Sequence, residues 1–145
     1  MIAVIQRVTK ARVGVRDTTI SRINHGMLIL LGIRKGDTVD QVSRLAQRCV
    51  NLRVFEDSDG KFNLSLKDVG GEALVVSQFT LLADTSRGRR PSFTDAEEPK
   101  QSELLYDAFI QHMMGCGIPT KAGAFGEHML VSLDNDGPVT IILEE

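Results

Sequence analysis

The chain has 145 residues, of which 42% are hydrophobic and 25% charged, and its 17 Lys and Arg against 19 Asp and Glu give a formal net charge of -2. This length is typical of one domain, and we expect a single domain over residues 1–145 that buries about two thirds of its unfolded surface. The composition excludes a disordered chain, and the balance of charge excludes a broadly basic coat for nucleic acid.

The two cysteines, Cys49 and Cys116, do not form a C-x-x-C pair. This pattern favours a reducing compartment and provides no zinc framework. The N-terminus lacks the basic and then apolar pattern of a signal peptide, and the longest apolar run, residues 27–33, is too short to cross a membrane. We therefore expect a cytoplasmic protein.

The first third of the chain is β-rich. Residues 2–8 predict a strand, and residues 12–15 and 18–23 predict a hairpin about Arg16-Asp17. The apolar run at 27–33 indicates a strand that is buried on both faces. A helix should follow, with Asp37 or Thr38 as its N-cap. Its apolar stripe recurs at helical spacing as Val39, Val42, Leu45, Ala46, Cys49 and Val50.

Turn residues at 57–60 and 68–71 bound a short edge strand at 62–66, and residues 73–79 predict a second buried strand. Residues 84–98 form a long polar stretch, and such a loop in a compact domain is usually functional or mobile.

A second helix is predicted from about Pro99 to the glycines at 115 and 117. Its expected buried stripe is Leu104, Leu105, Ala108, Phe109, His112 and Met113. Two strands at 128–133 and 139–143 should flank a turn at 135–138. Because two helices cannot cover both faces of the sheet, we expect a layered α/β/β arrangement or a partly closed sheet, and an uncovered face would favour a dimer.

Several common catalytic motifs are absent from the sequence, including G-x-G-x-x-G, H-E-x-x-H and G-x-S-x-G. His25, His112 and His128 have no partners at metal-ligand spacing. We therefore expect neither a metal nor a cofactor.

The segment Ser77-Gln78-Phe79-Thr80-Leu81 stands where a buried strand ends, which is where α/β proteins place reactive groups. Strand alternation predicts Ser77 and Phe79 on one side and Gln78 and Thr80 on the other. The Gln78 amide could form hydrogen bonds with the edge of a base, and the Phe79 ring could stack on that base. The hydroxyl of Ser77 or Thr80 could be a nucleophile or a positioning donor. An ordinary polar strand terminus fits the same residues. A nucleophile is poorly supported, because no histidine lies nearby in the sequence to activate it.

The segment Asn135-Asp136-Gly137-Pro138-Val139-Thr140 is typical of a turn. Gly137 permits close approach of a backbone, and a peptide bond before proline can be cis. A rigid turn of this kind could act as a filter for shape without using a side chain.

Two further loops could line a site. Arg87, Arg89 and Arg90 could grip phosphate, although a solvated loop fits them too. Residues 123–126 (GAFG) could wall a pocket or form a simple turn.

The two segments SQFTL and NDGPVT in a chain of this length resemble those of a D-aminoacyl-tRNA deacylase, and the resemblance covers essentially the whole chain. Further matching stretches are AVIQRV, LLGI with KGD, NLRVFED, GGEALVVSQFTL, GRRPSF and FGEHMLVSL. The resemblance implies an α/β fold of three layers, α/β/β, with two main helices on a mixed, partly barrel-like sheet. It also implies a homodimer with active sites at the subunit interface.

The resemblance further implies an ester hydrolase that removes D-amino acids, and glycine from mischarged tRNA, at the acceptor end of tRNA as translational proofreading. Ser77 and Thr80 would be catalytic, and Gln78 and Phe79 would bind substrate. A cis bond at Gly137-Pro138 would enter the opposite subunit's site and reject L-amino acids. Thr80 as nucleophile and attack by water assisted by the ribose 2′-hydroxyl both remain open, and we favour Thr80 as a positioning or oxyanion group.

Two rival functions fit the same residues. One is a peptidase or amidase that uses Thr80 or Ser77 as its nucleophile. The other is a small dimeric module that binds RNA ends without turnover.

Overall fold

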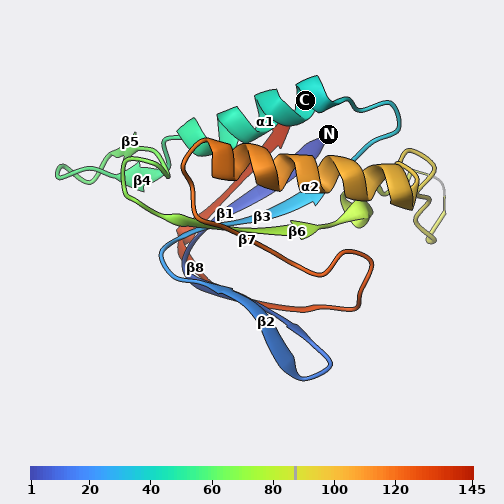
Figure 1. Cartoon of the computed structure of the whole chain (residues 1–145), viewed down its shortest axis with the longest axis horizontal. Helices are drawn as coiled ribbons and strands as arrows, with labels where there is room; N and C mark the ends of the chain where they lie inside the picture. The colour runs from blue at the N-terminus through green and yellow to red at the C-terminus, as the bar shows by residue number, and fades with distance from the viewer. Residues whose placement is uncertain (87) are drawn as a thin grey trace.

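The computed structural model describes every residue except residue 87, and Figure 1 shows its arrangement. The long elements are β1 (Ile2–Val15), β2 (Thr18–Ile23), β3 (Gly26–Gly32), α1 (Val39–Asn51), β6 (Glu72–Ser77), α2 (Pro99–Gly115) and β8 (Leu130–Glu144). The short ones are β4 (Phe55–Glu56), β5 (Phe62–Leu64), the 3-10 helix η1 (Phe79–Leu82) and β7 (Thr120–Ala122).

The main sheet has the order β2-β1-β3-β6-β7, and β8 pairs with β1. β1 changes partner along its length: residues 2–8 pair with β3, residues 11–15 pair with β2, and β8 follows both halves. The sheet therefore bends where β1 passes from one partner to the other. The expected hairpin is confirmed, and its turn residues Arg16 and Asp17 have positive φ of 47° and 66°.

The elements form layers, with α1 and α2 over one face of the sheet and β2 with the curled parts of β1 and β8 below the other (Figure 1). Each side of the sheet has its own core, as β3 shows. Met27, Ile29 and Leu31 belong to the core beneath the helices, whereas Leu28 belongs to the core on the opposite side. This explains the unbroken apolar run of β3. The expected α/β fold, with two helices on a mixed, partly barrel-shaped sheet, is confirmed.

The start of α1 is fixed by a capping box. The Thr38 hydroxyl accepts a hydrogen bond from the Gln41 backbone, and the Gln41 side chain accepts one from the Thr38 backbone. The alternative cap, Asp37, is wrong, because its carboxylate accepts hydrogen bonds from the Met1 ammonium at 2.9 Å and from the Arg34 backbone at 2.7 Å.

The second helix spans Pro99–Gly115, as expected, but its buried face differs in part from the prediction. Leu104 is 58% exposed, whereas Tyr106 and Ile110 are buried. Among the residues described, no helix is long and apolar enough to cross a membrane.

Candidate active site

The segment Ser77–Thr80 lies where β6 leaves the sheet. Ser77 is the last strand residue and pairs with Leu31 of β3, and the Gln78 amide donates to the Leu31 carbonyl at 2.8 Å. The chain then turns into η1, so the expected strand over residues 73–79 is two residues too long. The parallel pairing of β3 and β6 places this strand end at one edge of the sheet.

This early end of the strand corrects the predicted sidedness. Gln78 and Phe79 do not continue the alternation, because Gln78 already has non-strand dihedral angles of φ -145° and ψ 78°. The Gln78 side chain instead donates from Nε2 to Oγ1 of Thr80 at 2.5 Å. A hydroxyl that accepts in this way keeps its own hydrogen for donation. Thr80 therefore presents an oriented, exposed O–H donor.

The chemistry available to Thr80 is limited by its neighbours. Within the described part of the chain, its hydroxyl has Gln78 as its side-chain partner, and no imidazole or carboxylate is bonded to it. Activation of a hydroxyl nucleophile requires such a base. The arrangement therefore suits donation to a developing negative charge better than nucleophilic attack.

An aromatic pair stands beside this strand end. Phe79 is 54% exposed, and its ring packs edge-to-face on Phe93 with 5.0 Å between the ring centroids. Phe93 comes from the long loop at 84–98, which is closed by paired backbone hydrogen bonds of 2.8 and 2.9 Å between Asp84 and Ser92. Sequence reasoning missed Phe93 as a site residue, although it lies in the stretch GRRPSF. The pair offers an exposed aromatic surface to a planar ring.

The same loop carries the arginines that the sequence predicts as phosphate contacts. Arg89 and Arg90 are exposed on it, whereas Arg87 lies outside the described residues.

The GAFG loop lies next to the site. The Gly123 amide donates to the Val75 carbonyl at 2.8 Å, and the Tyr106 hydroxyl donates to the same carbonyl, also at 2.8 Å. Burial raises the pKa of Tyr106 to about 12, so this hydroxyl remains a donor at neutral pH. Phe125 packs against the Tyr106 ring at 5.7 Å. These contacts hold residues 123–125 beside the end of β6.

The Asn135–Thr140 segment is not the hairpin turn that the sequence predicts. β8 runs unbroken from Leu130 to Glu144, and the segment is an irregularity in its pairing with β1 between Gln6 and Lys10. The Asn135 side chain closes a ring across it by accepting from the Val139 amide at 2.8 Å and donating to the Val139 carbonyl at 3.2 Å. Such bulges redirect a strand locally.

Gly137 and Pro138 are exposed at this bulge, and the peptide bond between them is cis. Gly137 has φ of 133°, and a Cβ at this position would lie 2.7 Å from Cγ2 of Val139. Only glycine fits this conformation without strain. The segment therefore presents bare backbone to its surroundings.

A buried arginine supports this backbone. Arg7 is 5% exposed, and its Nε donates to the Asp136 carbonyl at 3.0 Å while Nη1 donates to the Val54 carbonyl at 2.7 Å. Its guanidinium also pairs with the carboxylates of Asp136 at 3.2 Å and Glu56 at 3.5 Å. Sequence reasoning missed Arg7. The available signal was an arginine at a core-facing position, because Met1, Ala3 and Ile5 are buried at the same alternation of β1.

One chain does not bring the two segments together. A Cβ at Gly32 would lie 2.9 Å from the Ile2 side chain and 3.2 Å from the Gln78 carbonyl, so Gln78 lies near the start of β1. Gly137 lies beside Arg7, five residues further along β1, a separation of roughly 17 Å along the strand. Within one chain, Gln78 and Gly137 therefore lie at separate places along the sheet.

No group of three or more metal-ligating side chains occurs among the residues that the structure describes.

Comparison with known proteins identifies the family. A family described as D-Tyr-tRNA(Tyr) deacylase matches residues 4–144. The chain is 49% identical to a D-aminoacyl-tRNA deacylase of Fervidobacterium nodosum, over 99% of this chain and 97% of that protein. It is 55% identical to a D-aminoacyl-tRNA deacylase of Roseiflexus castenholzii, over 99% of this chain and 92% of that protein. A solved structure of a c-Myc DNA Unwinding Element Binding Protein superposes with a TM-score of 0.95 at 42% identity, covering 100% and 99% of the two chains. The chain therefore belongs to the D-Tyr-tRNA(Tyr) deacylase family.

Proposed function

We propose that this protein hydrolyses the ester that joins a D-amino acid, or glycine, to the terminal adenosine of tRNA. The observation that carries the proposal is the match of nearly the whole chain to proteins named D-aminoacyl-tRNA deacylase at 49–55% identity. Water adds to the ester carbonyl carbon, the bond from that carbon to the ribose oxygen breaks, and the ribose oxygen leaves with a proton. The products are a free amino acid and a free tRNA, and the reaction serves translational proofreading.

Thr80 acts in this scheme as a donor to the oxyanion. Its hydroxyl accepts from Gln78 and is exposed, which supports donation to the carbonyl oxygen as negative charge develops. An aminoacyl ester is an activated substrate, so orientation and an oxyanion donor can suffice. The absence of a bonded base at Thr80 among the described residues supports attack by water, aided by the ribose 2′-hydroxyl, rather than by threonine. Ser77 would hold the substrate at the adjoining strand end.

The aromatic pair of Phe79 and Phe93 would bind the base of the terminal adenosine. Stacking of a base on an aromatic ring is typical of proteins that bind single-stranded RNA ends. The exposed Phe79 ring, supported edge-on by Phe93, is suited to this contact. The Gln78 side-chain oxygen Oε1 has no hydrogen-bond partner among the described residues and can accept from the base, because the Nε2 group of Gln78 is the one that binds Thr80.

Rejection of L-amino acids is proposed to come from the backbone of Gly137 and Pro138 in a partner subunit of a homodimer. A backbone element that lies close to one side of the substrate Cα excludes one enantiomer without selecting for a particular side chain. Glycine is not excluded, because it has no Cβ to clash with that backbone. The exposure of this segment, its support by Arg7 and Asn135, and its distance from Gln78 within one chain favour the arrangement.

The test is release of amino acid from D-Tyr-tRNA, L-Tyr-tRNA and Gly-tRNA, with D-tyrosine amide and a D-tyrosyl peptide in parallel. We expect hydrolysis of the D-Tyr and Gly esters and none of the L-Tyr ester. Turnover of the amide or peptide in preference to the ester would instead support a peptidase or amidase. Binding of D-Tyr-tRNA without ester cleavage would support a module that only binds RNA ends.

A further inference from the structure

We propose that the outward face of the β1–β2 hairpin, formed by Arg12, Arg16 and Arg22, binds the phosphate backbone of the tRNA acceptor stem. This inference rests on the proposed function. It adds a second contact surface for tRNA, separate from the arginines of the loop at 84–98.

The register of the hairpin brings two like charges together. Arg12 of β1 is paired directly with Arg22 of β2, and both are exposed while Ala11, Val13 and Ile23 around them are buried. Like charges directly opposite one another on a sheet are unfavourable. An anion between the two guanidinium groups would therefore relieve the electrostatic repulsion between Arg12 and Arg22.

The protein itself does not supply that anion. Across residues 1–86 and 88–145, no carboxylate forms an ion pair with Arg12, Arg16 or Arg22. The acids that line the adjoining cavities are Asp17 in the hairpin turn and Asp134, whose carboxylate is already bound to Lys10 at 3.0 Å. The face therefore carries an excess of positive charge on a chain whose net charge is -2.

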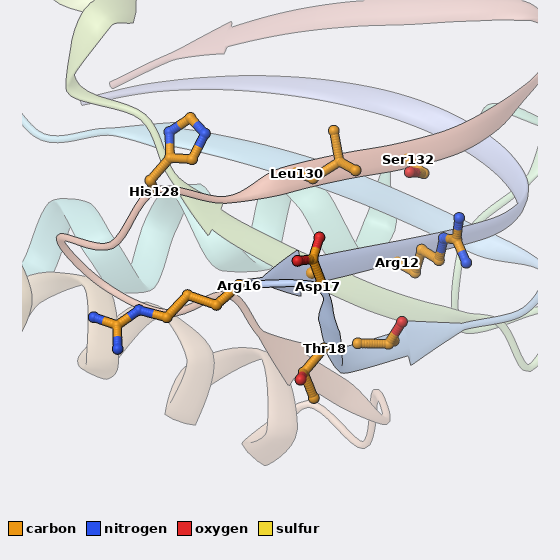
Figure 2. A pocket seen from close by; sticks show the side chains of 9 residues that line it. Arg12, Arg16, Asp17, Thr18, His128, Leu130 and Ser132 are labelled. Carbon is orange, nitrogen blue, oxygen red and sulfur yellow. The ribbon is translucent and has the colours of Figure 1, made fainter.

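The surface beside these arginines is hollowed. Two adjoining cavities of about 460 and 510 Å³ share Arg12 and Ser132 as lining residues. In the first cavity, Arg12 and Arg16 point away from each other with Asp17 between them (Figure 2). Thr18 and Asn24 add neutral donors, one to each cavity. Guanidinium groups spread along a groove with hydroxyl and amide donors match the spaced phosphates of a nucleic-acid strand.

The arginine in the hairpin turn has a backbone conformation that is unfavourable for its residue type. Arg16 has φ of 47°, in a region where glycine, asparagine or aspartate is preferred in two-residue hairpin turns. A side chain kept at such a position often serves function rather than stability.

The hairpin is linked to the GAFG loop, which lies beside the end of β6. His128 and Leu130 line the first cavity and belong to the segment that returns from the GAFG loop beside the end of β6. Ser21 of β2 donates to the Ala122 carbonyl at 2.5 Å, which ties the hairpin to the residue before that loop. RNA that enters the site with its terminal nucleotide can therefore continue over the hairpin.

The experiment compares the wild type with Arg12→Gln, with the double variant Arg12→Gln/Arg22→Gln, and with Arg53→Gln, an exposed arginine beside β4, as the matched control. Binding of an uncharged acceptor-stem RNA hairpin is measured by fluorescence anisotropy at several salt concentrations. We expect the double variant to bind about tenfold more weakly and its salt slope to fall by about 2, with the control unchanged.

Turnover separates this surface from the ester site. For D-Tyr-tRNA, KM should rise in the double variant at unchanged kcat, while hydrolysis of D-tyrosyl-adenosine, which has no phosphate, should be unaffected. The melting temperature should rise by about 1–3 °C, because a repulsive pair is removed. This rise also shows that the variant folds.

Three results would overturn the inference: unchanged RNA binding and salt slope, equal losses with D-tyrosyl-adenosine, or a shift of the oligomeric state in sedimentation without a change in RNA binding. If the wild type bound the RNA hairpin through these arginines but released no D-tyrosine, the proposed function would fail while the binding surface would stand.

Discussion

The guanidinium of Arg7 donates from Nε to the carbonyl oxygen of Asp136 at 3.0 Å, and so links the core of the sheet to the residue that precedes Gly137. The same side chain reaches the Val54 carbonyl at 2.7 Å, on the segment between α1 and β4. A buried arginine with several acceptors holds its neighbours in a fixed position, because leaving any of these acceptors unpaired is costly. Arg7 is therefore a positioning residue for the backbone of the Gly137–Pro138 segment.

Replacing Arg7 should loosen this segment and lower stability. Arg7→Gln leaves buried carbonyl oxygens without a donor, and we expect a loss of about 2–4 kcal/mol in the free energy of unfolding. The proposed stereochemical filter predicts that L-Tyr-tRNA hydrolysis rises relative to D-Tyr-tRNA hydrolysis. Urea unfolding and the two rates check the prediction, with Lys10→Gln on the exposed face of β1 as control. An unchanged ratio of D to L rates would show that Arg7 serves stability alone.

Thr80 should matter through its hydroxyl hydrogen. Thr80→Val keeps the shape of the side chain but removes the donor, and loss of one oxyanion donor typically lowers kcat by about 100-fold or more. Thr80→Ser keeps the hydroxyl and should retain most of the activity. Steady-state kinetics with D-Tyr-tRNA check the difference. Isolation of a covalent D-tyrosyl ester on Thr80 of the wild type would instead establish threonine as the nucleophile.

Mixed dimers test whether the filter comes from the partner subunit. One chain carries Thr80→Val and the other Gly137→Ala, whose added Cβ would lie 2.7 Å from Val139 Cγ2. If the two segments meet across the dimer, one of the two sites has wild-type parts from both chains, and the mixed dimer should recover activity that rejects L-Tyr-tRNA. If they acted within one chain, the sole active site would contain the altered Gly137 and would lack selectivity.

Phe79 should contribute to binding of the terminal nucleotide. Phe79→Leu keeps an apolar side chain but removes the ring, and we expect KM for D-Tyr-tRNA to rise about 5- to 10-fold. Leu104→Ala, at another exposed apolar position on α2, provides the control and should leave KM unchanged. A fall in kcat at constant KM would contradict a role in binding.

Alkaline pH should destabilise the fold through two buried groups. Burial raises the pKa of the Cys49 thiol from 9.0 to about 12, and burial raises the pKa of Tyr106 from 10.0 to about 12. The unfolded chain therefore ionises first, and each group lowers the free energy of unfolding by up to about 1.4 kcal/mol per pH unit above its unfolded pKa. The stabilisation is complete below pH 9 and is lost by pH 12.

The comparison of Cys49→Ala with the wild type isolates one of these groups. The variant should be less stable at neutral pH, because it leaves a small cavity, but its stability should fall less steeply between pH 9 and 12. Cys116→Ala serves as the control and should keep the wild-type slope. Identical slopes in all three proteins would show that Cys49 does not stay protonated in the folded state.

The local sequence pattern correctly predicted those elements whose structure depends on residues close together in the chain. The N-cap at Thr38, one of the two predicted, the helix from Pro99 and the hairpin at Arg16-Asp17 depend on residues within one or two turns of each other. The same reasoning wrongly extended the strand β6 to Phe79, whereas the strand ends at Ser77. The error arises because apolar residues continue in the sequence after the chain has left the sheet. This reasoning also predicted a hairpin turn at 135–138, because Asn, Gly and Pro favour turns in isolation. In the fold, both flanking segments pair with β1, which makes one long strand with a bulge.

The sequence by itself predicted the two helices, most of the strands and the family, because periodicity and short motifs are local properties of the chain. The tertiary structure alone decided that Arg7 lies beneath Gly137, that Phe93 joins Phe79, and that Gly137 lies roughly 17 Å along the sheet from Gln78. These relationships follow from strand register and from loop paths that join residues far apart in the chain. Only packing of the whole molecule fixes such distances.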